Sequence, residues 1–250
     1  MNRHYLTALP IYNEHAHVRS VLAKVRQTSD AILVVDDGSS DGTRELLQQE
    51  KDILLITHPE NRGYGAALQS AFQYAIDHQY EFLVTIDCDG QHEPQRIPML
   101  VEACQDADIA SGSRYLEMFP TDGSPPEQRK NINLQIISNL QELLGLELTD
   151  AFCGFKAYRV AALEKLQITE TGYAMPLELW IQAVHHELRI QEVPVPLIYL
   201  DESRSFGGVL DDGQTRLEYY QQVIRKSLLA IGRTPSSLAT MANNESDPPL

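Results

Sequence analysis

The chain has few of the residues that mark disulfide-bonded, membrane-spanning or nucleic-acid-binding proteins. Its 250 residues include three cysteines and one tryptophan, with 20 lysines and arginines against 35 aspartates and glutamates. The cysteines form no CxxC pair, which argues against a disulfide framework or a zinc site and favours a reducing compartment. The longest apolar runs, such as residues 31–35, are far below the roughly 18 residues of a membrane span. We therefore expect a cytoplasmic protein without a transmembrane segment.

The charge balance excludes partners that require a basic protein surface. The formal net charge is −15, and both halves are acidic, with −10 over residues 1–125 and −5 over residues 126–250. Nucleic acids and anionic membrane surfaces attract cationic faces, which neither half supplies. Nucleic-acid binding is therefore excluded. The first residues lead directly into an apolar run, without a hydrophobic leader, so we also expect no secretion signal.

Apolar runs typical of strands alternate with helical patterns through the first 110 residues. Strands are predicted at residues 5–9, 31–35, 53–57, 81–86 and 108–110. Helices are predicted at residues 15–27, from the N-cap Asp41 to residue 50, after Gly63, and at residues 94–104. This alternation predicts an α/β fold, in which helices cover both faces of a mostly parallel sheet.

The second half of the chain is less regular. Residues 117–128 are predicted to form a loop over the site. Helices are predicted at residues 129–144, 160–166, 176–187 and 215–231, and a proline-broken edge strand at residues 190–199. We expect the last helix to pack on its own domain or on a second subunit in a homodimer, with peripheral membrane contact as the alternative.

Acidic residues follow two of the predicted strands. Asp36 and Asp37 end one strand, and Asp87 and Asp89 follow another. Ligands of open α/β sheets bind outside the carboxyl ends of the strands, so both pairs should converge on one crevice. Two carboxylates, with the amide oxygen of Gln91, suit Mg²⁺ or Mn²⁺, which commonly bridge such ligands to substrate phosphates. The alternative is that these aspartates only cap turns and helices.

Several motifs in a fixed order resemble the family 2 glycosyltransferases of the GT-A fold. They are LPIYNE at 9–14, VVDDGSSDGT at 34–43, NRGYGAA at 61–67, DCDGQHEP at 87–94, GSRY at 112–115, DAFCGFKAYR at 150–159 and EVPV at 192–195. Within the family, this set is similar to the dolichyl- or polyprenyl-phosphate sugar transferases. The resemblance covers about residues 4–205. It implies one GT-A domain over residues 1–232, with a nucleotide-sugar and metal half (about 4–115), an acceptor half (about 116–232) and a disordered tail (233–250).

The resemblance also implies roles for individual residues. The donor-binding residues would be Pro10, Tyr12, Glu14, Asp36, Asp37, Gly63, Gly65 and Asp87. The metal ligands would be Asp87, Asp89 and Gln91, and the catalytic residues Asp89, Arg114, Arg129 and Arg204. Gly63 and Gly65 would leave room for the donor, with tight helix packing as the alternative reading. Glu178 would orient acceptor-side groups or cap polar backbone.

The acceptor side departs from the family pattern. The family often has a serine four residues after the Arg129 position and an asparagine eight residues after it, where this chain has Asn133 and Ile137. The block that reads RxxGxSK in the family reads RSFGGVL here, from Arg204 onward, so its lysine is missing. These departures bear on the acceptor more than on the donor.

The resemblance predicts a metal-dependent, inverting glycosyltransferase. It would move mannose or glucose from a nucleotide sugar, such as GDP-mannose or UDP-glucose, to a polyprenyl or dolichyl phosphate. Alternatives are transfer to a hydroxyl acceptor, a non-catalytic sugar-nucleotide-binding protein, and a haloacid-dehalogenase-type phosphatase, whose strand–DxDG opening residues 82–90 also resemble. A Rossmann dehydrogenase is disfavoured, because the Gly63-Tyr64-Gly65 segment lacks the third glycine.

Overall fold

A computed structural model describes residues 5–198 and 208–234 of the chain. Its centre is a seven-stranded sheet with the strand order β3-β2-β1-β4-β6-β5-β7. The strands are β1 (Tyr5–Ile11), β2 (Ile32–Asp36), β3 (Leu54–Thr57), β4 (Phe82–Thr85), β5 (Ile109–Ser113), β6 (Lys156–Arg159) and β7 (Ile190–Pro194). All neighbouring strands pair in parallel except β6, which is antiparallel to β4 and β5. The predicted mostly parallel α/β sheet is confirmed.

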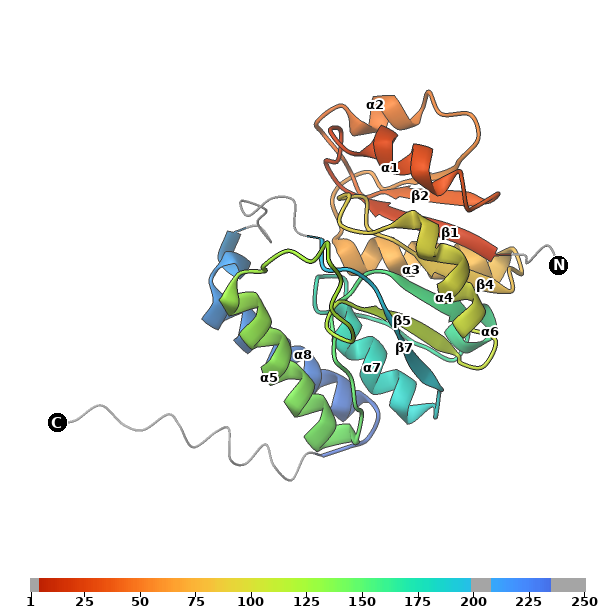
Figure 1. The fold of residues 1–250 in the computed structure, drawn as a ribbon. Coiled ribbons are helices and arrows are strands. Elements are labelled where there is room, and N and C mark those ends of the chain that lie inside the picture. The colour runs from red at the N-terminus through yellow and green to blue at the C-terminus, as the bar shows by residue number, and fades with distance from the viewer. Residues whose placement is uncertain (1–4, 199–207, 235–250) are drawn as a thin grey trace.

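Helices flank this sheet (Figure 1). They are α1 (Val18–Val25), α2 (Thr43–Leu47), α3 (Tyr64–Asp77), α4 (Ile97–Ala103), α5 (Glu127–Leu144), α6 (Val160–Leu163), α7 (Met175–His185) and α8 (Gly213–Ala230). Short 3-10 turns, η1 (Pro94–Arg96) and η2 (Gly208–Asp211), precede α4 and α8.

The strands bury alternate side chains on opposite faces of the sheet, as the period of two in a β-strand requires. From β1, Leu6 and Ala8 join one core, which includes buried residues of α3, α5, α7 and α8. Leu9 and Ile11 join the other core, with residues of α1, α2 and α4. In the described part of the chain, both faces of the sheet are therefore covered.

The predicted strands and helices are present, with ends shifted by a few residues. The strand β6 was missed, because Lys156 and Arg159 give it two charged residues in four. It pairs with β4 and β5, which lie far from it in sequence. Asp41 also acts slightly differently from its prediction. Gly42 occupies the N-cap position, while the Asp41 carboxylate accepts the backbone N–H of Thr43 at 3.0 Å.

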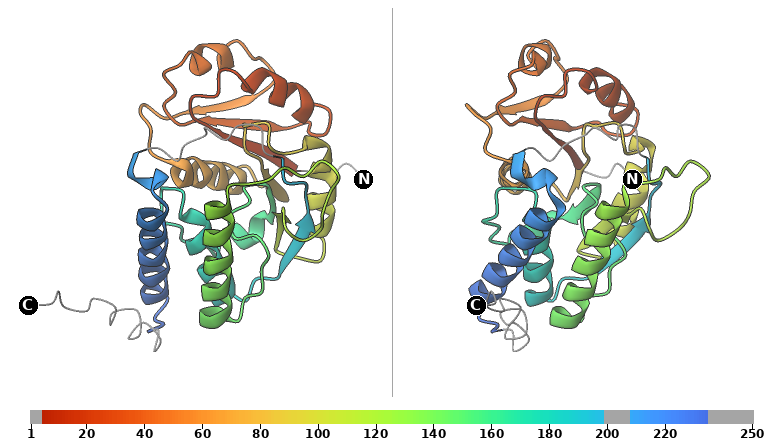
Figure 2. Two further views of the ribbon diagram at one scale, coloured as in Figure 1. Left: turned by 60° about the vertical axis from the view of Figure 1, so that its left-hand side comes forward. Right: turned by 90° about the vertical axis from the view of Figure 1, so that its left-hand side faces the viewer.

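The helices α5 and α8 lie side by side, away from α1 and α2 (Figure 2). The buried face of α8 includes Tyr220, Val223, Ile224 and Leu228, which belong to the larger core. The last helix therefore packs on its own chain, as expected. In residues 5–198 and 208–234, no helix is long and apolar enough to cross a membrane. Apart from residues 233 and 234, the predicted tail lies outside the described residues.

Candidate functional site

A cavity of about 670 Å³ opens at the carboxyl ends of β1, β2, β4 and β5. This is the rim of an α/β sheet where ligands bind, and the volume lies in the range of small-molecule sites. The aspartates that follow β2 and β4 both reach it, through Asp37 and through Asp87 and Asp89. The predicted convergence of the two acidic segments on one crevice is confirmed.

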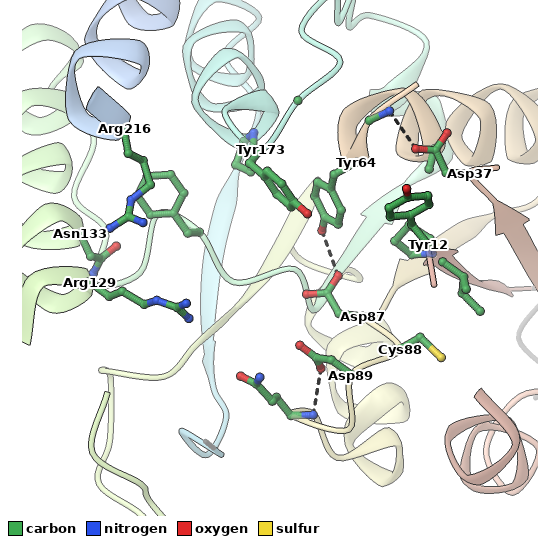
Figure 3. A pocket seen from close by; sticks show the side chains of 18 of the residues that line it. Tyr12, Asp37, Tyr64, Asp87, Cys88, Asp89, Arg129, Asn133, Tyr173 and Arg216 are labelled. Atoms are coloured by element: carbon green, nitrogen blue, oxygen red, sulfur yellow. Dashed lines mark hydrogen bonds between the residues drawn. The ribbon is translucent and has the colours of Figure 1, made fainter. Parts of the chain in front are cut away.

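The loop after β4 supplies an acidic side of the pocket (Figure 3). Asp87, Asp89 and Gln91 all line the cavity, in agreement with their predicted grouping. The Asp89 Oδ1 atom accepts the backbone N–H of Gln91 at 2.9 Å, which closes a tight turn and fixes the carboxylate. Three side chains whose oxygen atoms could bind a metal ion thus lie together at the end of one strand.

Asp87 is half-buried, and the polar groups around it favour its charged form. Tyr64 Oη donates a hydrogen bond of 3.1 Å to Asp87 Oδ1, and His92 Nε2 lies 3.5 Å from Asp87 Oδ2. Burial by itself raises the pKa of Asp87, but His92, Tyr64 and the buried Lys156 together lower that pKa overall. Gly154 permits this packing, because a Cβ there would lie 2.2 Å from Asp87 Oδ2.

The chemistry of the acidic side fits a divalent cation. Carboxylate and amide oxygens are the donors that Mg²⁺ and Mn²⁺ prefer. Within the described part of the chain, no three His, Cys, Asp or Glu side chains are grouped so that they could hold a metal ion by themselves. Two carboxylates at a strand end match the way in which Mg²⁺ is bound together with substrate phosphates.

The loop after β1 lines the same side of the cavity. Tyr12 and Glu14 of this loop line the cavity, together with Pro10 near the end of β1, as predicted for these three residues. The Asn13 N–H donates to Ser39 Oγ at 2.9 Å, and Asn13 Oδ1 accepts the Ser40 N–H at 2.8 Å. Asn13 has a φ of 55°, a conformation that asparagine tolerates better than most residues. These bonds tie the loops after β1 and β2 into one wall.

Asp37 and Asp36 have different positions despite being neighbours. Asp37 lines the cavity, where its carboxylate accepts the backbone N–H groups of Arg62 at 3.0 Å and Gly63 at 2.8 Å. His58 Nδ1 lies 2.6 Å from Asp37 Oδ1 and fixes it further. Asp36 is fully buried and bonds Arg44 Nε at 2.9 Å. Both oxygens of Asp36 are used inside the fold, since the other accepts a loop N–H, so its predicted role in donor binding is corrected to a structural one.

Gly63 and Gly65 are required by close packing. Gly63 has a φ of 104°, and a Cβ on it would lie 2.3 Å from the Thr171 carbonyl oxygen. A Cβ on Gly65 would lie 2.4 Å from the Glu170 carbonyl oxygen. The structure therefore favours the packing alternative for both glycines, although Gly63 also lines the cavity.

We expect Gly65→Ala to lower the free energy of unfolding by about 1–3 kcal/mol, because overpacking outweighs the better helix propensity of alanine. Denaturant unfolding would measure this. The control is Gln73→Ala on the exposed face of the same helix, for which we expect a change within about 0.5 kcal/mol. A Gly65→Ala protein as stable as wild type would contradict the packing assignment.

Arginines gather on the opposite side of the pocket (Figure 3). Arg129 and Asn133 come from α5, and Arg216 comes from α8. Asn133 Nδ2 donates to the Thr149 carbonyl at 3.1 Å, and Asn133 Oδ1 accepts the Ala151 N–H at 3.1 Å. Asn133, where the family often has a serine, thus holds residues 149–151 against α5.

Arg114 also lines the cavity, but its guanidinium is bound to Asp150. The Arg114 Nε and Nη2 atoms donate to the two Asp150 oxygens at 2.6 and 2.9 Å. Burial by itself raises the pKa of Asp150, but the Arg114 charge and hydrogen bonds lower that pKa overall. The structure places two of the three predicted arginines, Arg114 and Arg129, on the cavity wall. Arg114 is engaged by Asp150, Arg204 lies outside the described residues, and Arg129 has Arg216 as its cationic neighbour.

Glu178 takes the second of its two predicted roles. It is 4% exposed and does not line the cavity. Its carboxylate accepts the backbone N–H groups of Thr169 at 2.8 Å and Glu170 at 2.6 Å. Glu178 thus caps polar backbone, and it fixes the segment on which Gly65 packs.

Several lining residues were not singled out from the sequence as site residues, among them Tyr64, Tyr173 and Arg216. The rings of Tyr64 and Tyr173 stack with centroids 5.9 Å apart. Arg216 lies four residues before Tyr220, so both occupy one face of a helix. The spacing of Arg216 from the apolar residues of its helix could therefore have indicated that its side chain faces the domain interior. Tyr173 follows an irregular segment, where no such periodicity exists.

Curated relatives cover most of the chain. An undecaprenyl-phosphate mannosyltransferase of Micrococcus luteus is 30% identical over 221 residues, 83% of this chain and 89% of its own length. A polyprenol monophosphomannose synthase of Mycolicibacterium smegmatis is 32% identical and covers 76% of each chain. A UDP-N-acetylglucosamine–dolichyl-phosphate N-acetylglucosaminyltransferase of Methanococcus voltae is 29% identical over 80% of this chain and 87% of its own.

Solved structures share the fold. Glucosyl-3-phosphoglycerate synthase of Mycobacterium tuberculosis, in complex with Mn²⁺, UDP and glucosyl-3-phosphoglycerate, matches with a TM-score of 0.67 and 19% identity, over 94% of this chain and 82% of that chain. TarS of S. aureus, in complex with UDP-GlcNAc, has a TM-score of 0.60 and 15% identity, over 90% and 66% of the two chains. The fold is therefore GT-A, as expected.

The family assignment rests on a family model that matches more than half of the chain. Residues 7–167 match the family described as Glycosyl transferase family 2, and this range includes the whole acidic side of the pocket, Arg114 and Arg129. The phosphatase and the non-catalytic alternatives are thereby set aside, and the protein is a glycosyltransferase. The chain belongs to glycosyl transferase family 2.

Proposed function

We propose that this glycosyltransferase moves a hexose from a nucleotide diphosphate sugar to the phosphate of a polyprenyl phosphate. The observation that carries the proposal is a single cavity with a carboxylate side and an arginine side. The carboxylates suit a cation-bound diphosphate, and the arginines suit a second anion. The names of the mannosyltransferase relatives supply further support for a polyprenyl phosphate acceptor.

On the donor side, Asp87, Asp89 and Gln91 would hold Mg²⁺ or Mn²⁺. The cation, when bound, would neutralise the charge that develops on the diphosphate leaving group. Tyr12, with Pro10 and Glu14, would border the base and ribose, and Asp37 would keep the adjoining loop in position. A mannosyl donor such as GDP-mannose or a glucosyl donor such as UDP-glucose would fill this half.

On the acceptor side, the chemistry requires no obligatory general base. An alcohol must lose a proton as it attacks, whereas a phosphate is already ionised near neutral pH. Its oxygen could attack the sugar carbon directly, with inversion, while the nucleotide diphosphate leaves. The side chains then have to position the phosphate and balance its charge, which suits Arg129 and, beyond the described residues, Arg204.

A polyprenyl phosphate would be presented by a membrane, so we propose peripheral contact with the cytoplasmic membrane face, made by apolar side chains rather than by a basic surface. Met118 is 97% exposed and Leu116 is 41% exposed in the loop that leads from Tyr115 to Pro125. Tyr115 and Pro125 both line the cavity, so the loop that carries these exposed apolar side chains begins and ends at the cavity.

A thermal-shift panel of GDP, UDP, CDP and their sugars, each with Mg²⁺ or Mn²⁺, tests the donor half. A ligand that binds only the native state raises its stability in proportion to ln(1+[L]/Kd). We expect one nucleotide to raise the melting temperature in a cation-dependent way. No shift with any nucleotide would contradict the proposal.

We expect Arg129→Ala to weaken the interaction with the acceptor by about 1.5–3 kcal/mol, the range for hydrogen bonds to charged groups. Donor affinity should change little, because the nucleotide would bind at the acidic side. Steady-state kinetics with a short polyprenyl phosphate, beside donor titrations, separates the two. The matched control is Lys130→Ala, an exposed neighbour on α5, which should leave both unchanged. Equal losses in donor and acceptor binding would contradict the assignment.

A further inference from the structure

Among the cationic side chains of α8, Arg216 lines the pocket. The roles proposed above do not include this residue. We propose that Arg216 binds the phosphate of the acceptor together with Arg129, as a second cationic arm of the acceptor subsite. The inference rests on the proposed function, because it names a residue for that reaction. The ligand class is a phosphate monoester dianion, carried by a lipid or by a small soluble molecule.

The first argument is position. Arg216 is only 4% exposed, yet it lines the cavity on the side where Arg129 and Asn133 lie (Figure 3). Its Nη1 atom donates to the Leu210 carbonyl at 3.0 Å, so the guanidinium is held in place by the backbone. A pre-positioned side chain loses little conformational freedom when a ligand binds, which favours affinity.

The second argument is charge. Burial lowers the pKa of Arg216, and the neighbouring Arg129 charge adds to this effect, while Tyr220, Asp211 and Asp212 oppose it. The two aspartates are exposed at the start of the helix, outside the pocket lining. Two guanidinium groups that share one side of a cavity repel each other, and an anion between them turns that repulsion into attraction. A dianion with several acceptor oxygens matches two forked donors best.

The third argument is the sequence between the two candidate cations. From Ser205 to Thr215 the chain has no lysine or arginine, so Arg216 is the next cation after Arg204. The fold then turns this residue into the pocket, because α8 packs beside α5 and its buried face includes Arg216. A free-standing surface arginine would not be buried on the cavity side of its helix.

Equilibrium binding without a donor tests the inference. The probes are a short-chain prenyl monophosphate and inorganic phosphate, titrated against the full chain as wild type, Arg216→Gln and Arg216→Lys. We expect Arg216→Gln to weaken binding of the prenyl monophosphate roughly tenfold or more, the loss typical of a charged hydrogen bond. Arg216→Lys should recover part of it. The matched control is Arg225→Gln on the exposed face of the same helix, which should bind as wild type does.

Further readouts separate an anion-binding role from a structural one. A nucleotide titration of Arg216→Gln should give the wild-type donor affinity, and in turnover the loss should fall on the acceptor KM more than on kcat. If Arg216→Gln unfolds, the folded Arg216→Lys variant carries the test. A lysine ammonium cannot make the two-pronged contact of a guanidinium, so this variant should still bind the prenyl monophosphate measurably more weakly than wild type. Equal loss of donor and acceptor binding would overturn the inference.

The two probes identify the source of the phosphate. Tighter binding of the prenyl monophosphate than of inorganic phosphate supports a lipid, and equal affinities support a soluble phosphate. A wild-type protein that binds the prenyl monophosphate through Arg216 but never glycosylates it would overturn the proposed function and leave the anion subsite standing. Unchanged prenyl monophosphate affinity in both Arg216 variants would overturn the subsite alone.

Discussion

Asp89→Ala is expected to lower turnover by roughly 10³-fold or more, since metal-assisted charge stabilisation is worth several kcal/mol and each 1.36 kcal/mol is tenfold in rate. The reason is that the two aspartates after β4 have different surroundings. Asp87 is already contacted by Tyr64 and His92, whereas Asp89 stands at the pocket wall with its turn closed by the Gln91 backbone. Cation-dependent nucleotide binding should be lost along with turnover.

The experiment uses EDTA-stripped protein with Mn²⁺ added back. The melting temperature without ligand should stay at the wild-type value, because Asp89 is part of a surface turn and of neither core. Asp106→Ala, an exposed aspartate in the turn before β5, is the control and should keep full activity. Unchanged activity of Asp89→Ala would show that the residue does not hold the cation.

Asp150→Asn is expected to lower the free energy of unfolding by about 3–5 kcal/mol, the cost of removing one partner of a buried ion pair. Asp150 is fully buried and binds Arg114 through both oxygens, while it also accepts the Phe152 N–H at 3.1 Å. The substitution would leave the Arg114 charge without its counter-ion at the pocket wall. Denaturant unfolding at neutral pH measures the loss.

This pair also predicts a pH dependence. The pKa of Asp150 is lower in the folded protein than in an unfolded chain, where it is about 3.9. Its contribution to stability is therefore fully present above the unfolded value and is lost as the pH falls through the lower folded value. The difference in stability between wild type and Asp150→Asn should shrink only in that acidic range.

A matched control comes from the surface of the same protein. Asp52 makes a similar two-oxygen contact with Arg26, at 2.7 and 2.6 Å, but its side chain is 59% exposed. Asp52→Asn should change stability far less, because water screens exposed pairs. If Asp150→Asn cost no more than Asp52→Asn, burial of the Arg114 pair would not matter to the fold.

The alternation of strands and helices could be predicted because buried parallel strands have continuous apolar runs, as in residues 31–35. The strand β6 could not, since the environment that accepts Lys156 exists only after folding. The Lys156 side chain lies against the Trp180 ring, 5.3 Å from its centroid, and donates to the Cys153 carbonyl. The residues around Lys156 in the sequence do not indicate that Trp180 lies beside it in the fold.

The candidate site was predictable where chemistry follows a strand end, as for Asp87 and Asp89. The roles of two adjacent residues of the same amino-acid type could not be told apart from the sequence. Asp36 and Asp37 are equivalent in sequence, and only the fold places Arg44 beside the first and the cavity beside the second. Arg216 belongs to a third kind of case, because its role depends on how α8 packs, long after the family motifs end.

The most direct test of the central claim is product analysis of the wild-type enzyme. It would be incubated with a short polyprenyl phosphate, a nucleotide hexose chosen by thermal shift, and Mg²⁺ or Mn²⁺, and the lipid examined by mass spectrometry. The account predicts a lipid that has gained one hexose on its phosphate, in an amount that falls below detection with Asp89→Ala. Recovery of unchanged lipid, while a hydroxyl-bearing acceptor is glycosylated under the same conditions, would contradict it.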